Sequence, residues 1–124
     1  MTEPTAEDQT LKAQLRHALA ACAAAGETVT YQELVRRTAF PGPHAIHRLT
    51  LLLEALARAD HAAGRPLLAA LAVSRTSGIP GRGFFQLLSE LGRYHGPDQG
   101  PDAAAQHARE LAEAIAYWSR PARS

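Results

Sequence analysis

Four segments in the middle of the chain follow one another in an order that few folds accommodate. Residues 31–38 are predicted to form a short helix, and residues 43–63 a longer amphipathic helix. An apolar run over 66–73 comes next, and its composition is typical of a buried strand, although a helical turn has the same periodicity. Glycine and proline then make 75–83 a loop, because four such residues in six forbid regular structure.

This order of elements is typical of a winged helix-turn-helix. We therefore predict a mainly α fold that is winged helix-turn-helix-like, with a small β-hairpin around the 75–83 loop and with flanking N- and C-terminal helices. Its 124 residues suit a single domain over 1–124. The predicted parts are an N-terminal helix over 5–25, a winged-helix-like core over 26–95, a linker over 96–101 and a C-terminal helix over 102–119.

Local signals place the ends of the helices. Glycine commonly follows the last turn of a helix, so Gly26 is expected to end the first helix and Gly64 the third. Thr30 and Glu33 have the spacing of a capping box, in which the hydroxyl accepts from the Glu33 amide and the carboxylate binds the Thr30 amide. Pro43 suits the first position of the third helix, where its missing amide costs nothing.

The two central helices each have an apolar and a polar side. In the short helix the residues expected to be buried are Tyr31, Leu34 and Val35. In the longer helix the apolar side carries Ile46, Leu49, Leu52, Leu53 and Leu56. The polar side of that helix carries His44, His47, Arg48, Glu54 and Arg58.

The C-terminal helix carries an apolar stripe for which two roles are open. The stripe consists of Ala104, Ala108, Leu111, Ile115 and Trp118. We expect it to pack on the first helix. The alternative is that the 104–118 face binds a second copy or another protein, with Trp118 as the natural anchor of such an interface.

Charge is unevenly distributed along the chain. The formal net charge is +1, the sum of −2 over residues 1–30, +4 over 31–95 and −1 over 96–124. A basic centre favours an anionic partner, although a few surface arginines also occur simply as solvated side chains. The residues expected to contact nucleic acid are Arg36, Arg37, His44, His47, Arg48, Arg75 and Arg82. Arg75 and Arg82 flank the loop, where the forked donors of arginine suit phosphate.

One stretch of sequence resembles a known family. Gly26-x-x-Val-Thr-Tyr-Gln-Glu-Leu-Val35, followed by Phe40-Pro-Gly42, is similar to the opening of the DNA-binding domain in alkylguanine-DNA alkyltransferases and alkyltransferase-like proteins. The resemblance covers about residues 26–91 and implies a winged-helix fold whose recognition helix enters the minor groove of duplex DNA. The segment from Val73 to Phe85 also resembles a recurrent segment of uncharacterised bacterial winged-helix-like proteins.

Most functional residues of that family have no counterpart in this chain. Where the family has its Pro-Cys-His-Arg active-site segment, this chain has Ala69-Ala-Leu-Ala72, which offers no nucleophile. The family's arginine that intrudes into the DNA stack would align near Ala45 of this chain, and Arg48 lies one helical turn later. Of the family's functional residues, only Tyr31 matches directly. The resemblance therefore implies DNA binding without alkyl transfer.

Other classes of function lack their signals in the sequence. No nucleophile elbow is present, and the loop lacks the lysine and Ser/Thr ending of a P-loop, so we expect neither an enzyme nor a bound cofactor. His44 and His47 could share a metal, with Glu54 or a loop side chain as the obvious further ligand, but polar side chains at a helix start more often face solvent, so we expect no metal site. Cys22, the only cysteine, suits a small core position. The acidic N-terminus and the lack of a long apolar run predict a cytoplasmic protein without a membrane span.

Two functions thus remain as hypotheses. The first is non-catalytic binding of double-stranded DNA by the helix over 43–58 and the loop over 75–83. The second is a protein-interaction module that works through its own dimer or another protein.

Overall fold

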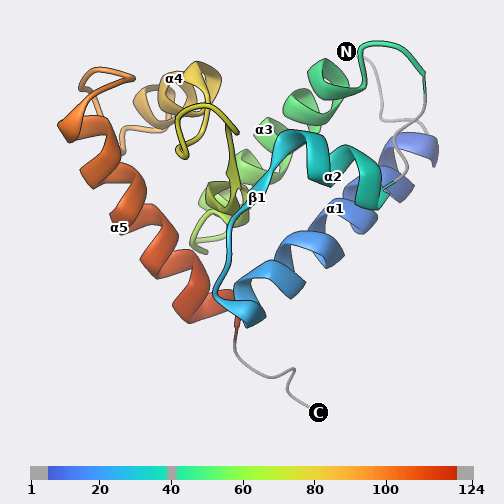
Figure 1. Cartoon of the computed structure of the whole chain (residues 1–124). Helices are drawn as coiled ribbons and strands as arrows, with labels where there is room; N and C mark the ends of the chain where they lie inside the picture. The colour runs from blue at the N-terminus through green and yellow to red at the C-terminus, as the bar shows by residue number, and fades with distance from the viewer. Residues whose placement is uncertain (1–5, 39–41, 120–124) are drawn as a thin grey trace.

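The computed structural model describes residues 6–38 and 42–119 and is mainly helical (Figure 1). The elements are α1 (Ala6–Ala25), β1 (Val29–Thr30), α2 (Tyr31–Thr38), α3 (Ala45–Ala62), the 3-10 turn η1 (Leu68–Leu71), β2 (Ala72–Val73), α4 (Arg82–Glu90) and α5 (Pro101–Trp118). Helices α1 and α5 converge at the lower end of the molecule in Figure 1, and α3 and α4 lie toward its upper end. No helix in the described ranges is long and apolar enough to cross a membrane.

Glycines end α1 and α3 as the sequence predicts. Gly26 has a φ of 69° and Gly64 a φ of 73°, the left-handed region that glycine adopts without strain. After α1 the amide of Glu27 donates to the carbonyl of Cys22 at 3.0 Å. After α3 the amide of Arg65 donates to the carbonyl of Asp60 at 2.8 Å. These bonds, which reach back from the residue after the glycine, satisfy carbonyls that would otherwise lack a partner.

The start of α2 confirms half of the predicted capping box. The Glu33 amide donates to Thr30 Oγ1 at 3.1 Å. The Glu33 carboxylate instead forms ion pairs with Arg36, at 2.9 Å, and Arg37, at 3.0 Å. Two cations one turn ahead on the same helix outcompete a neutral backbone amide for the carboxylate.

The start of α3 differs from the prediction. The helix begins at Ala45, and His44 precedes it in a left-handed conformation with a φ of 61°, so Pro43 is not the first helical residue. Ile46 is 39% exposed rather than buried, because it lies in the first turn and the buried face of α3 begins only at Leu49. Residues 39–41, which include Phe40 of the predicted turn, lie outside the described residues.

The apolar run over 66–73 is mostly not a strand. Leu68–Leu71 forms the buried 3-10 turn η1, and only Ala72–Val73 is extended. Side chains from two other helices bind the backbone of this turn: the Asp60 carboxylate accepts from the Leu68 amide at 3.2 Å, and His107 Nε2 donates to the Ala70 carbonyl at 2.9 Å. Backbone groups that a strand would pair with another strand are satisfied by side chains here.

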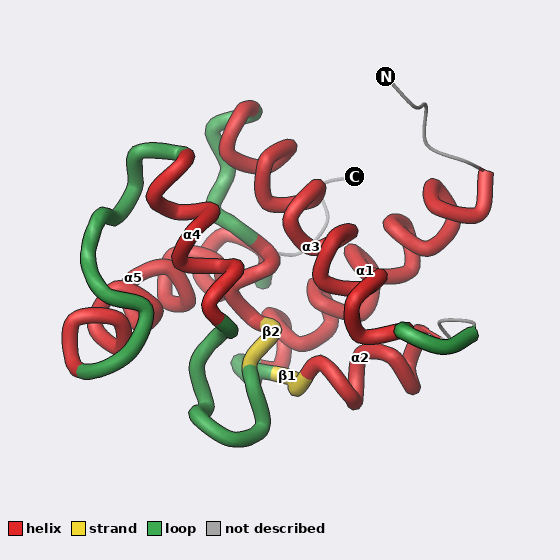
Figure 2. The backbone as a smooth tube through the Cα atoms, turned by 90° about the horizontal axis from the view of Figure 1, so that it is seen from above, coloured by secondary structure: helices red, strands yellow, loops and turns green. Residues whose placement is uncertain are grey.

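The prediction of a β-hairpin around 75–83 is wrong, because the strands in the described residues form no hairpin there. These two strands, β1 and β2, pair in parallel, with Val29 opposite Ala72 and Thr30 opposite Val73 (Figure 2). The segment after β2 folds back as an irregular loop, in which the Ser74 amide donates to the Ile79 carbonyl at 2.9 Å. Parallel strands need a crossover connection, which α2 and α3 supply.

Helix α5 packs on α1, as expected, and on η1, but partly with another face. Its buried residues are Ala103, Gln106, His107, Glu110 and Ala114. Ala104 and Ala108 of the predicted stripe are exposed, whereas Leu111, Ile115 and Trp118 pack against the core. Polar residues occupy the buried face because each finds a partner, as the Glu110 carboxylate does in Arg93, at 2.6 Å. A hydrophobic pattern cannot reveal such a face.

Candidate functional site

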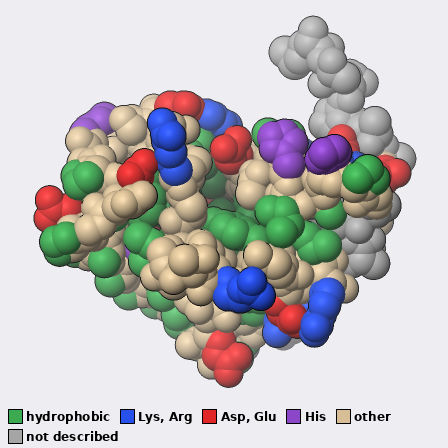
Figure 3. Space-filling model, turned by 45° about the horizontal axis from the view of Figure 1, so that its top comes forward, with side chains coloured by type: hydrophobic (Ala, Val, Ile, Leu, Met, Phe, Trp, Pro, Cys, Tyr) green, Lys and Arg blue, Asp and Glu red, His purple; other side chains and the backbone are tan. Residues whose placement is uncertain are grey.

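A small cavity lies at the centre of the segment that the sequence singles out. It has a volume of about 180 Å³ and is enclosed by the start of α2, the middle of α3, η1 and the start of α4. Its lining residues are Tyr31, Thr50, Leu53, Glu54, Ala69, Gly81, Gly83, Phe84 and Leu87. Figure 3 shows a hollow with hydrophobic side chains on its floor and with basic and acidic side chains around it. We call this feature the central cavity.

Tyr31 fixes one wall of the central cavity. Its hydroxyl accepts a hydrogen bond of 2.8 Å from the Gly81 amide, which ties the start of α2 to the end of the loop. Burial raises the pKa of Tyr31, and the bond from Gly81 opposes this rise only in part, so the hydroxyl keeps its proton at neutral pH. Tyr31 therefore presents both an O–H donor and a remaining lone pair.

Glu54 supplies the charge of the central cavity. Its partner at helical spacing would be Arg58, but Arg58 binds Glu90 of α4 instead. Within residues 6–38 and 42–119, Glu54 has no hydrogen bond or ion pair. A Cβ on Gly83 would lie only 3.3 Å from Glu54 Oε1, so the glycine lets the carboxylate approach the start of α4 closely.

The predicted nucleic-acid residues on α2 and α3 are largely engaged within the chain. Arg36 and Arg37 share the Glu33 carboxylate. Arg48 Nη2 lies 3.0 Å from Oε1 of Glu7, and the guanidinium is thereby held at the acidic start of α1. The other two are His44 and His47, both exposed at the first turn of α3.

Arg75, on the loop after β2, and Arg82, the first residue of α4, are more open to solvent. Arg75 is exposed and has no ion pair within the described ranges. The Arg82 side chain is 77% exposed, and its Nε lies 3.6 Å from Asp98 Oδ2, a loose contact. The loop that carries Arg75 is held by its own hydrogen bonds, including one of 2.9 Å from the Gly78 amide to the Ser74 carbonyl. The structure therefore brings loop and α3 together around the central cavity, whereas Arg48 turns toward α1.

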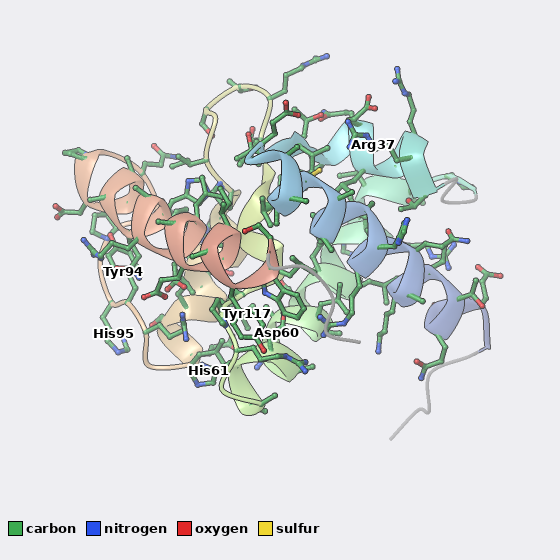
Figure 4. The ribbon with its side chains drawn as sticks, turned by 90° about the horizontal axis from the view of Figure 1, so that it is seen from below. Arg37, Asp60, His61, Tyr94, His95 and Tyr117 are labelled. Carbon is green, nitrogen blue, oxygen red and sulfur yellow. The ribbon has the colours of Figure 1, made fainter. Side chains whose placement is uncertain are left out.

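Sequence reasoning missed two buried ionic clusters on the other side of the molecule (Figure 4). In one, the fully buried Asp60 accepts from Arg16 at 2.9 Å and from Arg65 at 3.0 Å. In the other, Arg93 forms two hydrogen bonds with Glu110, of 3.1 and 2.6 Å. Figure 4 shows Asp60 at the end of α3. Sequence spacing gave no signal, because the partners come from different helices and loops.

Trp118 belongs to the first of these clusters. The guanidinium carbons of Arg16 and Arg65 lie 5.8 and 5.6 Å from its ring centroid, and its Nε1 donates to the Pro66 carbonyl at 3.0 Å. Trp118 thus anchors α5 within its own chain, which leaves the 104–118 face without the aromatic anchor expected for a dimer.

No group of three or more His, Cys, Asp or Glu side chains in the described part of the chain is arranged to hold a metal ion. Comparison with protein-family models, with curated proteins and with solved structures finds no match for this chain. A function for this chain must therefore be inferred from the geometry and charge of the site.

Proposed function

We propose that this protein is a non-catalytic, winged-helix-like module that binds double-stranded DNA through residues 43–58 and the loop over 75–83. The observation that carries the proposal is the position of two exposed arginines, Arg75 on the loop after β2 and Arg82 at the first position of α4, next to Gly81, which lines the central cavity. Helices α2 and α3 then form the helix-turn-helix-like pair, and the loop takes the position of the wing. Phosphate is the natural partner of such exposed guanidinium groups.

Internal ion pairs reduce the number of arginines that can serve in this way. Of the arginines between residues 31 and 95, those held at 3.0 Å or less by acidic residues of other segments are Arg48, Arg58, Arg65 and Arg93. Arg82 has only the contact of 3.6 Å with Asp98. Among the expected arginine contacts, the side chains of Arg36 and Arg82 are 78% and 77% exposed, and Arg75 is also exposed. Three phosphate contacts correspond to a slope of about −2.7 in a plot of log affinity against log salt, from about 0.9 for each phosphate.

Fluorescence anisotropy of a labelled duplex, measured across salt concentrations, tests the proposal. The double variant Arg75→Ala/Arg82→Ala should bind more weakly, and its salt slope should be shallower by about 2. Arg109→Ala, an exposed charge removal on α5, is the matched control and should bind like the parent protein. Absence of binding to any duplex at low salt, or equal loss in the double variant and the control, would refute DNA binding.

A protein-interaction module is the second candidate. Two large apolar side chains of α3 face solvent, Ile46 at 39% and Leu51 at 51% exposed. A protein partner bound on α3 would remove these apolar side chains from water. Analytical ultracentrifugation distinguishes the homodimer version: self-association that Leu51→Lys abolishes would support it, and a monomer at every concentration would exclude it.

A further inference from the structure

We propose that the central cavity binds a small organic cation, an amine or amidine with a compact flat apolar body, and that the Glu54 carboxylate is its counter-ion. This inference goes beyond the DNA proposal and does not depend on it. It rests on the charge, the acceptors and the size of the cavity.

The charge of the cavity selects a cation. Glu54 is the only charged side chain among the described residues that line it. Arg58, the internal counter-ion that helical spacing offers to Glu54, is occupied, because it binds Glu90. Glu54 is partly buried and lies against apolar walls, so its carboxylate would attract a cationic ligand with less screening by water than on an open surface. The same carboxylate repels phosphate, so the DNA backbone would stay outside the cavity.

The polar groups around Glu54 are suited to N–H donors. Thr50 Oγ1 donates its proton to the His47 carbonyl at 2.7 Å, which leaves its lone pairs as acceptors. The Tyr31 oxygen accepts only from Gly81 among the described residues and keeps a second lone pair. A carboxylate and two hydroxyl oxygens therefore line one cavity, and an ammonium or amidinium group, which has several donors, can satisfy more than one of them.

The remaining walls set the size and shape of the ligand. The floor is apolar and consists of Leu53, Ala69, Phe84 and Leu87. The Phe84 ring is held at 88° to Phe85, with ring centroids 5.5 Å apart, so this wall is pre-formed. A volume of about 180 Å³ is close to that of six water molecules and smaller than the pockets that hold drug-sized ligands. A single aromatic or short aliphatic group fits it.

Benzamidine and its neutral analogue benzamide provide the test. Both are added to the full chain, without DNA, while amide resonances are followed by two-dimensional NMR. We expect saturable shifts with benzamidine at the amides of Ala69, Gly81 and Gly83, and affinity at least about tenfold weaker for benzamide. Glu54→Gln should weaken benzamidine by a similar factor. Glu113→Gln, a charge removal on α5 with the side chain 62% exposed, is the control and should leave it unchanged.

Three results would overturn the proposal: no saturable shift at millimolar benzamidine, equal affinity for benzamide, or unchanged benzamidine affinity in Glu54→Gln. Because Glu54 has no partner within the described chain, its replacement by glutamine should leave the fold intact, and the unperturbed resonances of the variant verify this. Arg75→Ala/Arg82→Ala should bind benzamidine like the parent. Failure of cation binding and failure of DNA binding are therefore separate outcomes.

Discussion

Replacement of Asp60 by alanine should destabilise this protein more than removal of any exposed acid. The Asp60 side chain is fully buried, and one of its oxygens accepts from Arg16 at 2.9 Å and from Arg65 at 3.0 Å. The other oxygen accepts from the Leu68 amide at 3.2 Å. Alanine would leave two guanidinium groups facing each other without an anion, and a buried amide without an acceptor.

The expected loss of stability in Asp60→Ala follows from the interactions that the two arginines and the Leu68 amide lose. Removal of one partner from a buried ion pair costs about 3–5 kcal/mol, and an unsatisfied buried amide about 1–3 kcal/mol. The side chains of Arg16 and Arg65 are 30% and 35% exposed, so both can recover water, which favours the lower end of the range. We expect a loss of about 3 kcal/mol for Asp60→Ala. Asp60→Asn, which keeps an acceptor for Leu68, should lose less.

Urea unfolding followed by circular dichroism measures this difference, with Glu113→Ala as the control. Glu113 is 62% exposed and lies 3.8 Å from Arg93, so its removal should cost less than about 1 kcal/mol. Equal unfolding midpoints for Asp60→Ala and the control would show that desolvation of the buried carboxylate cancels its attraction to the two arginines. The ion cluster would then not be a source of stability.

Three further changes have expected outcomes. Thr30→Ala removes the cap on the Glu33 amide and should cost about 1 kcal/mol in urea unfolding; a change below about 0.3 kcal/mol would mean that solvent replaces the cap. Trp118→Ala should cost about 3 kcal/mol in the same assay, because the ring packs on the core between two arginines, and a small loss would show that α5 docks without it. Burial lowers the pKa of His107, so the folded state keeps the ring neutral while the unfolded state takes up a proton below about pH 6.5. The free energy of unfolding should therefore fall as the pH drops below that value. His107→Gln should weaken this pH dependence, and an identical pH profile in the variant would refute the role of His107.

Local sequence signals predicted the elements whose ends are set locally. Helix α2 occupies the predicted residues 31–38, because Thr30 caps its start with a bond three residues long. Gly26 ends α1 for a similarly local reason, the left-handed conformation. The 3-10 turn η1 was not predictable, since its backbone depends on Asp60 of α3 and His107 of α5, both distant in sequence.

The candidate site was also predictable only in part. The sequence predicted that residues 43–58 and the loop over 75–83 act together, and one residue from each, Thr50 and Gly81, lines the same cavity. It did not predict that the Glu54 carboxylate has no partner among the described residues, because helical spacing pairs Glu54 with Arg58, and the position of Glu90 on α4 removes this partner. It also did not predict that Arg48 turns to Glu7, a contact between two different helices.

The parallel pairing of β1 with β2 has a consequence for the order of events in folding. The strands are separated by residues 31–71, and closing a flexible loop of that length costs about 3 kcal/mol in chain entropy. Two residue pairs cannot offset this cost alone, so the ladder forms only after α2 and α3 have docked and drawn its ends together. We therefore expect the two strands to pair late in folding, after the amides of α2 and α3 have become protected from exchange.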